Sequence, residues 1–209
     1  MSLARAFFAA DPVTVARSLV GAVLEVTAPD GRRCAGRLVE VEAYGGPDDP
    51  ASHAAGGRTP RSTVMFGPPG VAYVYFIYGM HHCLNFVTGP AGQAGAVLIR
   101  ACEPLRGRED MARRRGLDPA HCRDRDVAGG PGRLCAAFGI DLGWNGLPVA
   151  AGQRHPPQAP GTMRVIAPGT PPNVVASPRV GIRKATDREW RFCDADSACL
   201  SQAARPPRR

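Results

Sequence analysis

The chain of 209 residues can bury one sizeable hydrophobic core, and no clear linker divides it, so we expect a single domain over residues 1–200. Its 26 basic residues, all arginine except Lys184, outnumber 18 acidic ones and give a net charge of +8. This positive charge favours a polyanionic partner. A chain whose composition simply prefers arginine to lysine would show the same charge without such a partner. The seven cysteines form no C-x-x-C pair, so we expect no zinc site and no disulfide framework. The apolar run from Leu3 to Ala10 is short and contains Arg5, so it resembles neither a signal peptide nor a membrane span, and we expect a cytoplasmic protein.

The first predicted elements are structural. Asp11 is suited to cap a helix that starts at Pro12 and runs to Leu19. A strand from Val23 to Val26 follows, and a Pro-Asp-Gly turn connects it to a partner strand from Cys34 to Tyr44.

The partner strand alternates in character. Apolar side chains share one face, and two carboxylates and a phenol point the opposite way, from Glu40, Glu42 and Tyr44. This pattern is typical of a strand with a solvated outer face. It also fits a pocket in which one glutamate acts as a general base beside an aromatic ring.

A polar loop extends from Gly45 to Arg61 and is rich in glycine, proline and charged residues. It contains His53, which is either solvated or part of a pocket built on the neighbouring strand. Arg58 and Arg61 flank a Thr-Pro pair and could contact phosphate groups.

Aromatic residues concentrate in the stretch from Val71 to Phe86, which holds three of the four tyrosines in the chain. Tyr73, Tyr75 and Ile77 alternate with other apolar residues, and a glycine follows Tyr78, so we predict a hairpin with Tyr78 at its tip. Such aromatics can simply pack a sheet, but their proximity to carboxylates also suits a stacking pocket.

The next predicted elements are a central strand from Ala94 to Ala101, which carries Arg100 near its end, and a helix from Leu105 to Arg115. In that helix the i, i+4 pairs Glu109/Arg113 and Asp110/Arg114 indicate a solvated face. A shorter helix from Arg133 to Phe138 follows a glycine-rich entry.

The C-terminal third contains many prolines and glycines and is expected to form short strands and loops. Arg179 to Ile182 and Trp190 to Cys193 are candidate returns to the sheet. Residues 201–209 are expected to form a frayed tail.

Five motifs, in order, resemble the alkyladenine (3-methyladenine) DNA glycosylase family: GRLVEVEAY (36–44), SHAAGGRTPR (52–61), YVYFIYGMHHCLN (73–85), VLIRACEP (97–104) and GPGRLCAAFGI (130–140). The resemblance covers roughly residues 3 to 142 and returns at RVGI (179–182). It implies an α+β single domain, with a curved antiparallel sheet, peripheral helices and a protruding β-hairpin that inserts into DNA.

The resemblance also implies a role for seven residues. Glu42 would activate water and Arg100 would be its charged neighbour. The remaining five would act on the extruded nucleotide. Its base would stack between aromatic walls formed by Tyr44, His53 and Tyr75. Asn85 would disfavour the amino group of normal guanine, and Tyr78 would fill the gap left in the duplex.

These assignments imply a monofunctional enzyme of DNA repair. It would bind double-stranded DNA, flip out a damaged purine and hydrolyse its N-glycosidic bond, leaving an abasic site. Alkylated adenine and guanine are the expected substrates, with hypoxanthine and ethenoadenine as further candidates. We expect a monomer without metal, other cofactor or membrane partner, associated with the nucleoid if the organism is bacterial.

Two other functions remain compatible with the sequence. A noncatalytic minor-groove protein that binds lesions would use the same basic surface and Tyr78, but would have no need of Glu42. A nucleosidase that acts on free nucleosides would keep Glu42 and the stacking rings, but would have no need of Tyr78.

Overall fold

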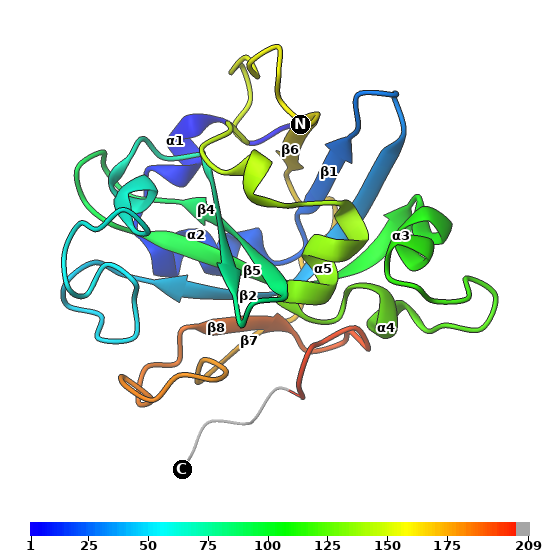
Figure 1. Ribbon diagram of the computed structural model, residues 1–209. Coiled ribbons are helices and arrows are strands. Elements are labelled where there is room, and N and C mark those ends of the chain that lie inside the picture. Colours follow the sequence, from blue (N-terminus) through cyan, green and yellow to red (C-terminus); the bar gives the residue numbers. More distant parts are fainter. Residues whose placement is uncertain (204–209) are drawn as a thin grey trace.

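A strongly curled antiparallel sheet organises the chain (Figure 1), and the computed structural model describes it within residues 1–203. The main order of strands is β3-β4-β5-β2-β1-β6, with β8 paired to β2 and β7 paired to β8. The strands are β1 (Val23–Thr27), β2 (Arg33–Tyr44), β3 (Ala72–Ile77), β4 (His81–Val87), β5 (Ala96–Arg106), β6 (Thr162–Ile166), β7 (Val174–Ser177) and β8 (Arg191–Asp194).

Short helices surround the sheet, as the resemblance predicts for an α+β fold (Figure 1). They are α1 (Arg5–Phe8), α2 (Pro12–Leu19), α3 (Arg108–Arg114), α4 (Asp124–Ala128) and α5 (Pro131–Phe138), with 3-10 turns at Thr63–Phe66 and Leu142–Trp144. The longest of those within residues 1–203 have eight residues, so none in that part of the chain reaches across a membrane.

The long strand β2 is the centre of the fold because it pairs along its whole length. One edge pairs with β5. The other edge pairs first with β1, through Arg33 to Arg37, and then with β8, through Glu40 to Glu42. The second half of β2 therefore lies between two strands, and both faces of this half are buried.

Most of the early elements match the sequence predictions. Helix α2 has the predicted ends, and the Asp11 carboxylate accepts hydrogen bonds from the backbone N–H groups of Val13 and Thr14. The predicted aromatic hairpin is confirmed as β3 and β4, which pair from Ala72 opposite Phe86 to Ile77 opposite His81.

The strand after the hairpin is longer than predicted. Strand β5 continues to Arg106, so the helix expected from Leu105 begins only at Arg108. Pairing of β5 with β2 keeps this part of the chain extended, because Glu103 lies opposite Arg37 and forms an ion pair with it, at 2.8 Å. Gly107, with φ of 70°, then turns the chain into α3.

Only one of the two predicted i, i+4 ion pairs on α3 forms. Arg113 binds Glu109 at 2.9 Å and also Asp110 at 3.2 Å. Arg114 instead donates a hydrogen bond to the backbone carbonyl of Ala137 on α5. A packing contact between two helices thus replaces the predicted surface pair.

The C-terminal third differs most from the prediction. Arg179 to Ile182 is not a strand but an irregular segment. Strand β6 lies in the proline-rich part, where short strands were expected but none was given a position. Trp190 to Cys193 does join the sheet, as β8. Of the predicted frayed tail, residues 201–203 are held by hydrogen bonds to Glu40 and Arg191, and residues 204–209 lie outside the described part of the chain.

Candidate active site

A cavity of about 380 Å³ opens between the hairpin, the edge of β2 and β5, the polar loop and the start of α5. Six of the seven predicted site residues line it: Tyr44, His53, Tyr75, Tyr78, Asn85 and Arg100. These residues come from four separate segments of the chain, namely β2, the polar loop, the β3–β4 hairpin and β5, and the curl of the sheet brings them together.

Aromatic rings form one wall of the cavity. The rings of His53 and Tyr75 meet edge to face with centroids 4.6 Å apart, and the Tyr73 and Tyr75 centroids are 5.4 Å apart. His53 Nδ1 lies 3.0 Å from the hydroxyl of Tyr73, and this hydrogen bond fixes the orientation of the imidazole ring. Partial burial, and then the nearby charge of Arg61, lower the pKa of His53, so its ring is neutral at pH 7.

Tyr44 supplies a second aromatic surface, and a buried arginine supports its ring. The Arg179 guanidinium carbon lies over both rings, 4.7 Å from the centroid of Tyr44 and 5.1 Å from that of Trp190. Both terminal nitrogens of Arg179 bind the Asp49 carboxylate, at 2.6 and 2.8 Å. Because Arg179 is thus locked, the Tyr44 ring has a rigid backing.

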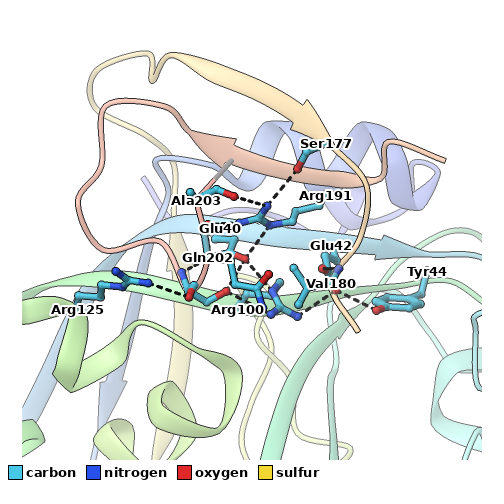
Figure 2. A network of polar contacts seen from close by, with 11 residues as sticks. Glu40, Glu42, Tyr44, Arg100, Arg125, Ser177, Val180, Arg191, Gln202 and Ala203 are labelled. Carbon is cyan, nitrogen blue, oxygen red and sulfur yellow. Dashed lines mark hydrogen bonds and ion pairs between the residues drawn. The ribbon is translucent and has the colours of Figure 1, made fainter. Parts of the chain in front are cut away.

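Glu42 is fully buried, with 0% of its surface exposed, and lies directly behind the cavity wall. Its carboxylate accepts three hydrogen bonds, all from residues that line the cavity: the Tyr44 hydroxyl at 2.9 Å, Arg100 Nη1 at 3.2 Å and the backbone N–H of Val180 at 2.6 Å (Figure 2). These three residues separate the Glu42 carboxylate from the cavity.

The Tyr44 hydroxyl remains protonated as a donor to Glu42. Burial raises its pKa above the usual value, and the negative charge of Glu42 raises it further. Tyr44 therefore serves both as an aromatic surface and as a hydrogen-bond donor to the candidate base.

Glu40 lies two residues before Glu42 and is also fully buried, which shows that the interpretation of this strand face as solvated is wrong. It accepts bonds from Arg100 Nε and Arg191 Nε, both at 2.8 Å, and from the N–H and hydroxyl of Ser201. Burial tends to raise the pKa of Glu40, but the charges of Arg100 and Arg191 and the Ser201 bonds outweigh it and hold the pKa below the usual value.

Asn85 lies on β4 directly opposite Tyr73 and is 3% exposed. Its Nδ2 group donates a hydrogen bond of 3.1 Å to the Tyr73 backbone carbonyl, so the amide is held at the cavity wall in a fixed orientation.

Tyr78 occupies the hairpin tip, as predicted, and is 81% exposed. Its φ of 55° belongs to the left-handed region, which the tight turn requires. Met80 and Phe76 are also exposed, so the tip presents three large apolar side chains next to the mouth of the cavity.

Three contributors to the site were not singled out by sequence reasoning. Tyr73 was treated as a hairpin residue only, although its period of two with Tyr75 puts both rings on the same face. Val180 was included only in a short motif, and its backbone role has no side-chain signal. Ser201 was assigned to a frayed tail.

Comparison with known proteins agrees with the motifs. A family model described as methylpurine-DNA glycosylase (MPG) matches residues 6–198. Relatives named "Putative 3-methyladenine DNA glycosylase" occur in Nitrosospira multiformis, at 47% identity over 200 residues (96% of this chain and 94% of the relative), and in Streptomyces avermitilis, at 45% over 209 residues (99% and 94%). A third, from Methanocella arvoryzae, is 43% identical over 206 residues (97% and 96%). The chain therefore belongs to the methylpurine-DNA glycosylase family.

Proposed function

We propose that this protein is a monofunctional DNA glycosylase that removes damaged purines from double-stranded DNA. The observation that carries the proposal is the buried Glu42, held by three residues of an aromatic cavity whose mouth adjoins an exposed apolar hairpin tip. The relatives' names point to the same activity and to 3-methyladenine as a substrate. The expectation of a monomer that acts in the cytoplasm, or at the nucleoid of a bacterium, belongs to this proposal.

The cavity is suited to a single flipped base. Its volume of about 380 Å³ is near the lower end of small-molecule sites, which run from about 300 to 1,000 Å³. The rings of Tyr44, His53 and Tyr75 provide stacking surfaces, each worth about 1–3 kcal/mol per base. Such stacking is of the size needed to offset the few kcal/mol that flipping a base costs.

Hydrolysis in this site needs one base and one water. As the bond between C1′ and the purine nitrogen breaks, its electron pair leaves with the purine, and positive charge develops on the sugar. The Glu42 carboxylate stabilises that charge and takes a proton from the water that attacks C1′, while Arg100 orients the carboxylate. A purine already cationic through alkylation leaves as a neutral molecule.

The chain offers little for a Schiff-base mechanism. Its only lysine is Lys184. In the part of the chain that the structure describes, Lys184 does not line the cavity. An abasic site is therefore the expected product, with the DNA strand intact.

The direct test is single-turnover excision from a labelled duplex that carries one alkylated purine, with parallel duplexes that carry hypoxanthine or no lesion. Strand breaks that appear only after alkaline treatment support the proposal. Breaks before alkali indicate a lyase, and tight binding of the lesion without any excision favours the noncatalytic lesion-binding protein.

Replacing Tyr78 with alanine is expected to slow excision from duplex DNA by about tenfold or more, because the exposed ring no longer fills the gap left by the flipped nucleotide. The measurement compares duplex and single-stranded substrates, since a single strand leaves no gap to fill. Met80→Ala, at the same tip, is the matched control and is expected to have the smaller effect. An equal loss on both substrates contradicts a wedge role.

Lowering the pH through the pKa of His53, which lies below 6.5, is expected to weaken binding of a duplex with a cationic alkylated purine more than one with hypoxanthine. Above that pKa the ring is neutral; below it, a charged ring faces a charged base. Binding is measured in the Glu42→Gln background, where no excision interferes, over a series of pH values that starts at 7.5 and descends for as long as the protein stays folded. His53→Phe keeps a ring that does not titrate, so a pH response that survives in it sinks the assignment.

A further inference from the structure

The last described residues of the chain contact the charged cluster next to the candidate active site. Ser201 donates from its backbone N–H to Glu40 Oε2 at 2.6 Å and from its hydroxyl to Glu40 Oε1 at 2.7 Å. The same hydroxyl accepts a hydrogen bond of 3.2 Å from Arg100 Nη2. One side chain near the C-terminus thus joins two buried charged residues of the central strands β2 and β5.

Two arginines hold this segment in place (Figure 2). Arg191, on β8, donates to the backbone carbonyls of Gln202 and Ala203 while its Nε binds Glu40. Arg125, on α4, donates to the Ser201 carbonyl at 3.1 Å. The backbone that follows the Ser201 side chain is therefore held by arginines from two different elements, α4 and β8.

Arg100 has three donor nitrogens, and each has a different partner. Nε binds Glu40, Nη1 binds Glu42 and Nη2 binds Ser201. A guanidinium is planar and rigid, so the bonds at two of its nitrogens set the direction of the third. The orientation in which Arg100 meets Glu42 is thus determined by Glu40 and Ser201, neither of which lines the cavity.

We propose that Ser201 is a positioning residue for the glycosylase reaction, which acts by holding Arg100 against Glu42. This inference rests on the proposed function. Without the hydroxyl, Nη2 of a buried guanidinium loses its acceptor, and Arg100 can turn toward another one and away from Glu42. The carboxylate then meets its water less often in the productive orientation.

The test uses three full-length variants and the duplex with one alkylated purine. Ser201→Ala removes the hydroxyl and keeps the N–H bond to Glu40. Ser201→Thr restores a hydroxyl. Ser197→Ala is the matched control, because Ser197 lies in the same C-terminal segment and its hydroxyl binds a different carboxylate, Glu103, which does not line the cavity.

Ser201→Ala is expected to lower the single-turnover rate about tenfold, with the Kd for the duplex and the melting temperature the same as those of Ser197→Ala. Ser201→Thr is expected to recover most of the rate. If the role of Ser201 were purely structural, Ser201→Ala would change the melting temperature but not the excision rate measured at a temperature well below melting.

Several results overturn the inference while leaving the proposed function intact, provided that the wild type excises the lesion. The first two are a wild-type excision rate in Ser201→Ala and a rate loss in Ser197→Ala as large as that in Ser201→Ala. The third is a Ser201→Ala variant that binds the duplex more weakly but excises at the wild-type rate. The fourth is a Ser201→Thr variant that binds the duplex with an unchanged Kd but does not recover the excision rate. An inactive wild type overturns the proposed function, and this inference with it.

Discussion

Replacing Glu42 with glutamine is expected to lower the single-turnover rate of base excision by about 10²- to 10⁴-fold, the usual contribution of a general base. The amide has nearly the shape of the carboxylate but cannot take a proton from water or offer a full negative charge to the developing sugar cation. Excision is measured on a duplex with one alkylated purine, under enzyme excess, followed by alkaline cleavage of abasic sites.

Binding should survive this change. Glu42 lies behind the cavity wall and is not among the residues that line the cavity, so the surfaces that contact a flipped base keep their shape. Oε2 accepts from both Tyr44 and Arg100, and Oε1 accepts from Val180, so an amide whose nitrogen takes the place of Oε1 loses only the bond from Val180. That loss should lower the free energy of unfolding by about 1–3 kcal/mol, which melting detects and which leaves the protein folded.

The control for this experiment is Glu103→Gln. Glu103 also lies on the central sheet and pairs with an arginine, Arg37, but it does not line the cavity or contact Glu42. It should keep the wild-type rate of excision. If Glu42→Gln excised at the wild-type rate, the general base would have to be another group; if it lost binding and rate together, the carboxylate would instead organise the cavity.

Local patterns in the sequence were enough to predict the elements that carry most of the site. The alternation of Glu40, Glu42 and Tyr44 places their side chains on one face, and the tyrosines of β3 follow the same period of two. A glycine after Tyr78 marks the turn. The resemblance in motif order then connected segments that are far apart in the chain, and all six of these segments, RVGI included, meet at the cavity.

The burial of Glu40 could not be predicted from the same pattern. A strand that alternates between apolar and charged residues normally has one solvated face. Here β8 pairs with the second half of β2, and Arg191 on β8 arrives from 151 residues further along the chain to neutralise Glu40. Such a partner has no local signal, and this part of the sequence is broken up by prolines and glycines.

The extension of β5 was missed for a related reason. Helix-forming residues follow Pro104, and their propensity favours a helix from Leu105. Pairing of Glu103 with Arg37 across the sheet outweighs that preference and keeps the chain extended as far as Arg106. Propensity is a weak term compared with a ladder of hydrogen bonds in a buried sheet.

Replacing Arg191 with methionine is expected to lower the free energy of unfolding by about 3–5 kcal/mol, the usual result of removing one partner of a buried ion pair. Arg191 is 2% exposed, and its loss leaves Glu40, at 0%, with half of its neutralising charge. For a domain of this length that corresponds to a fall in melting temperature of roughly 6–20 °C. Thermal and urea unfolding at pH 7 measure it.

The double variant Glu40→Leu/Arg191→Met provides the control. It removes one negative and one positive charge together, so Arg100 and Glu42 remain as a neutral pair, and apolar groups that replace a buried pair are often neutral for stability. The double variant should therefore be more stable than Arg191→Met alone, with a coupling energy of the order of 0.5–3 kcal/mol. Additive losses would show that Glu40 and Arg191 do not depend on each other.

The pH dependence of stability offers an independent check on the same pair. Burial tends to raise the pKa of Glu40, but Arg100, Arg191 and Ser201 together hold it below its usual value of 4.5. A carboxylate whose folded-state pKa is lowered contributes stability that is fully present above the unfolded-state pKa and is lost as the pH falls through the folded-state value. Wild type should thus lose this contribution below pH 4.5, and the double variant, which has no carboxylate at position 40, should lose less over the same range. Equal acid sensitivity of the two proteins would mean that Glu40 is not the group that titrates.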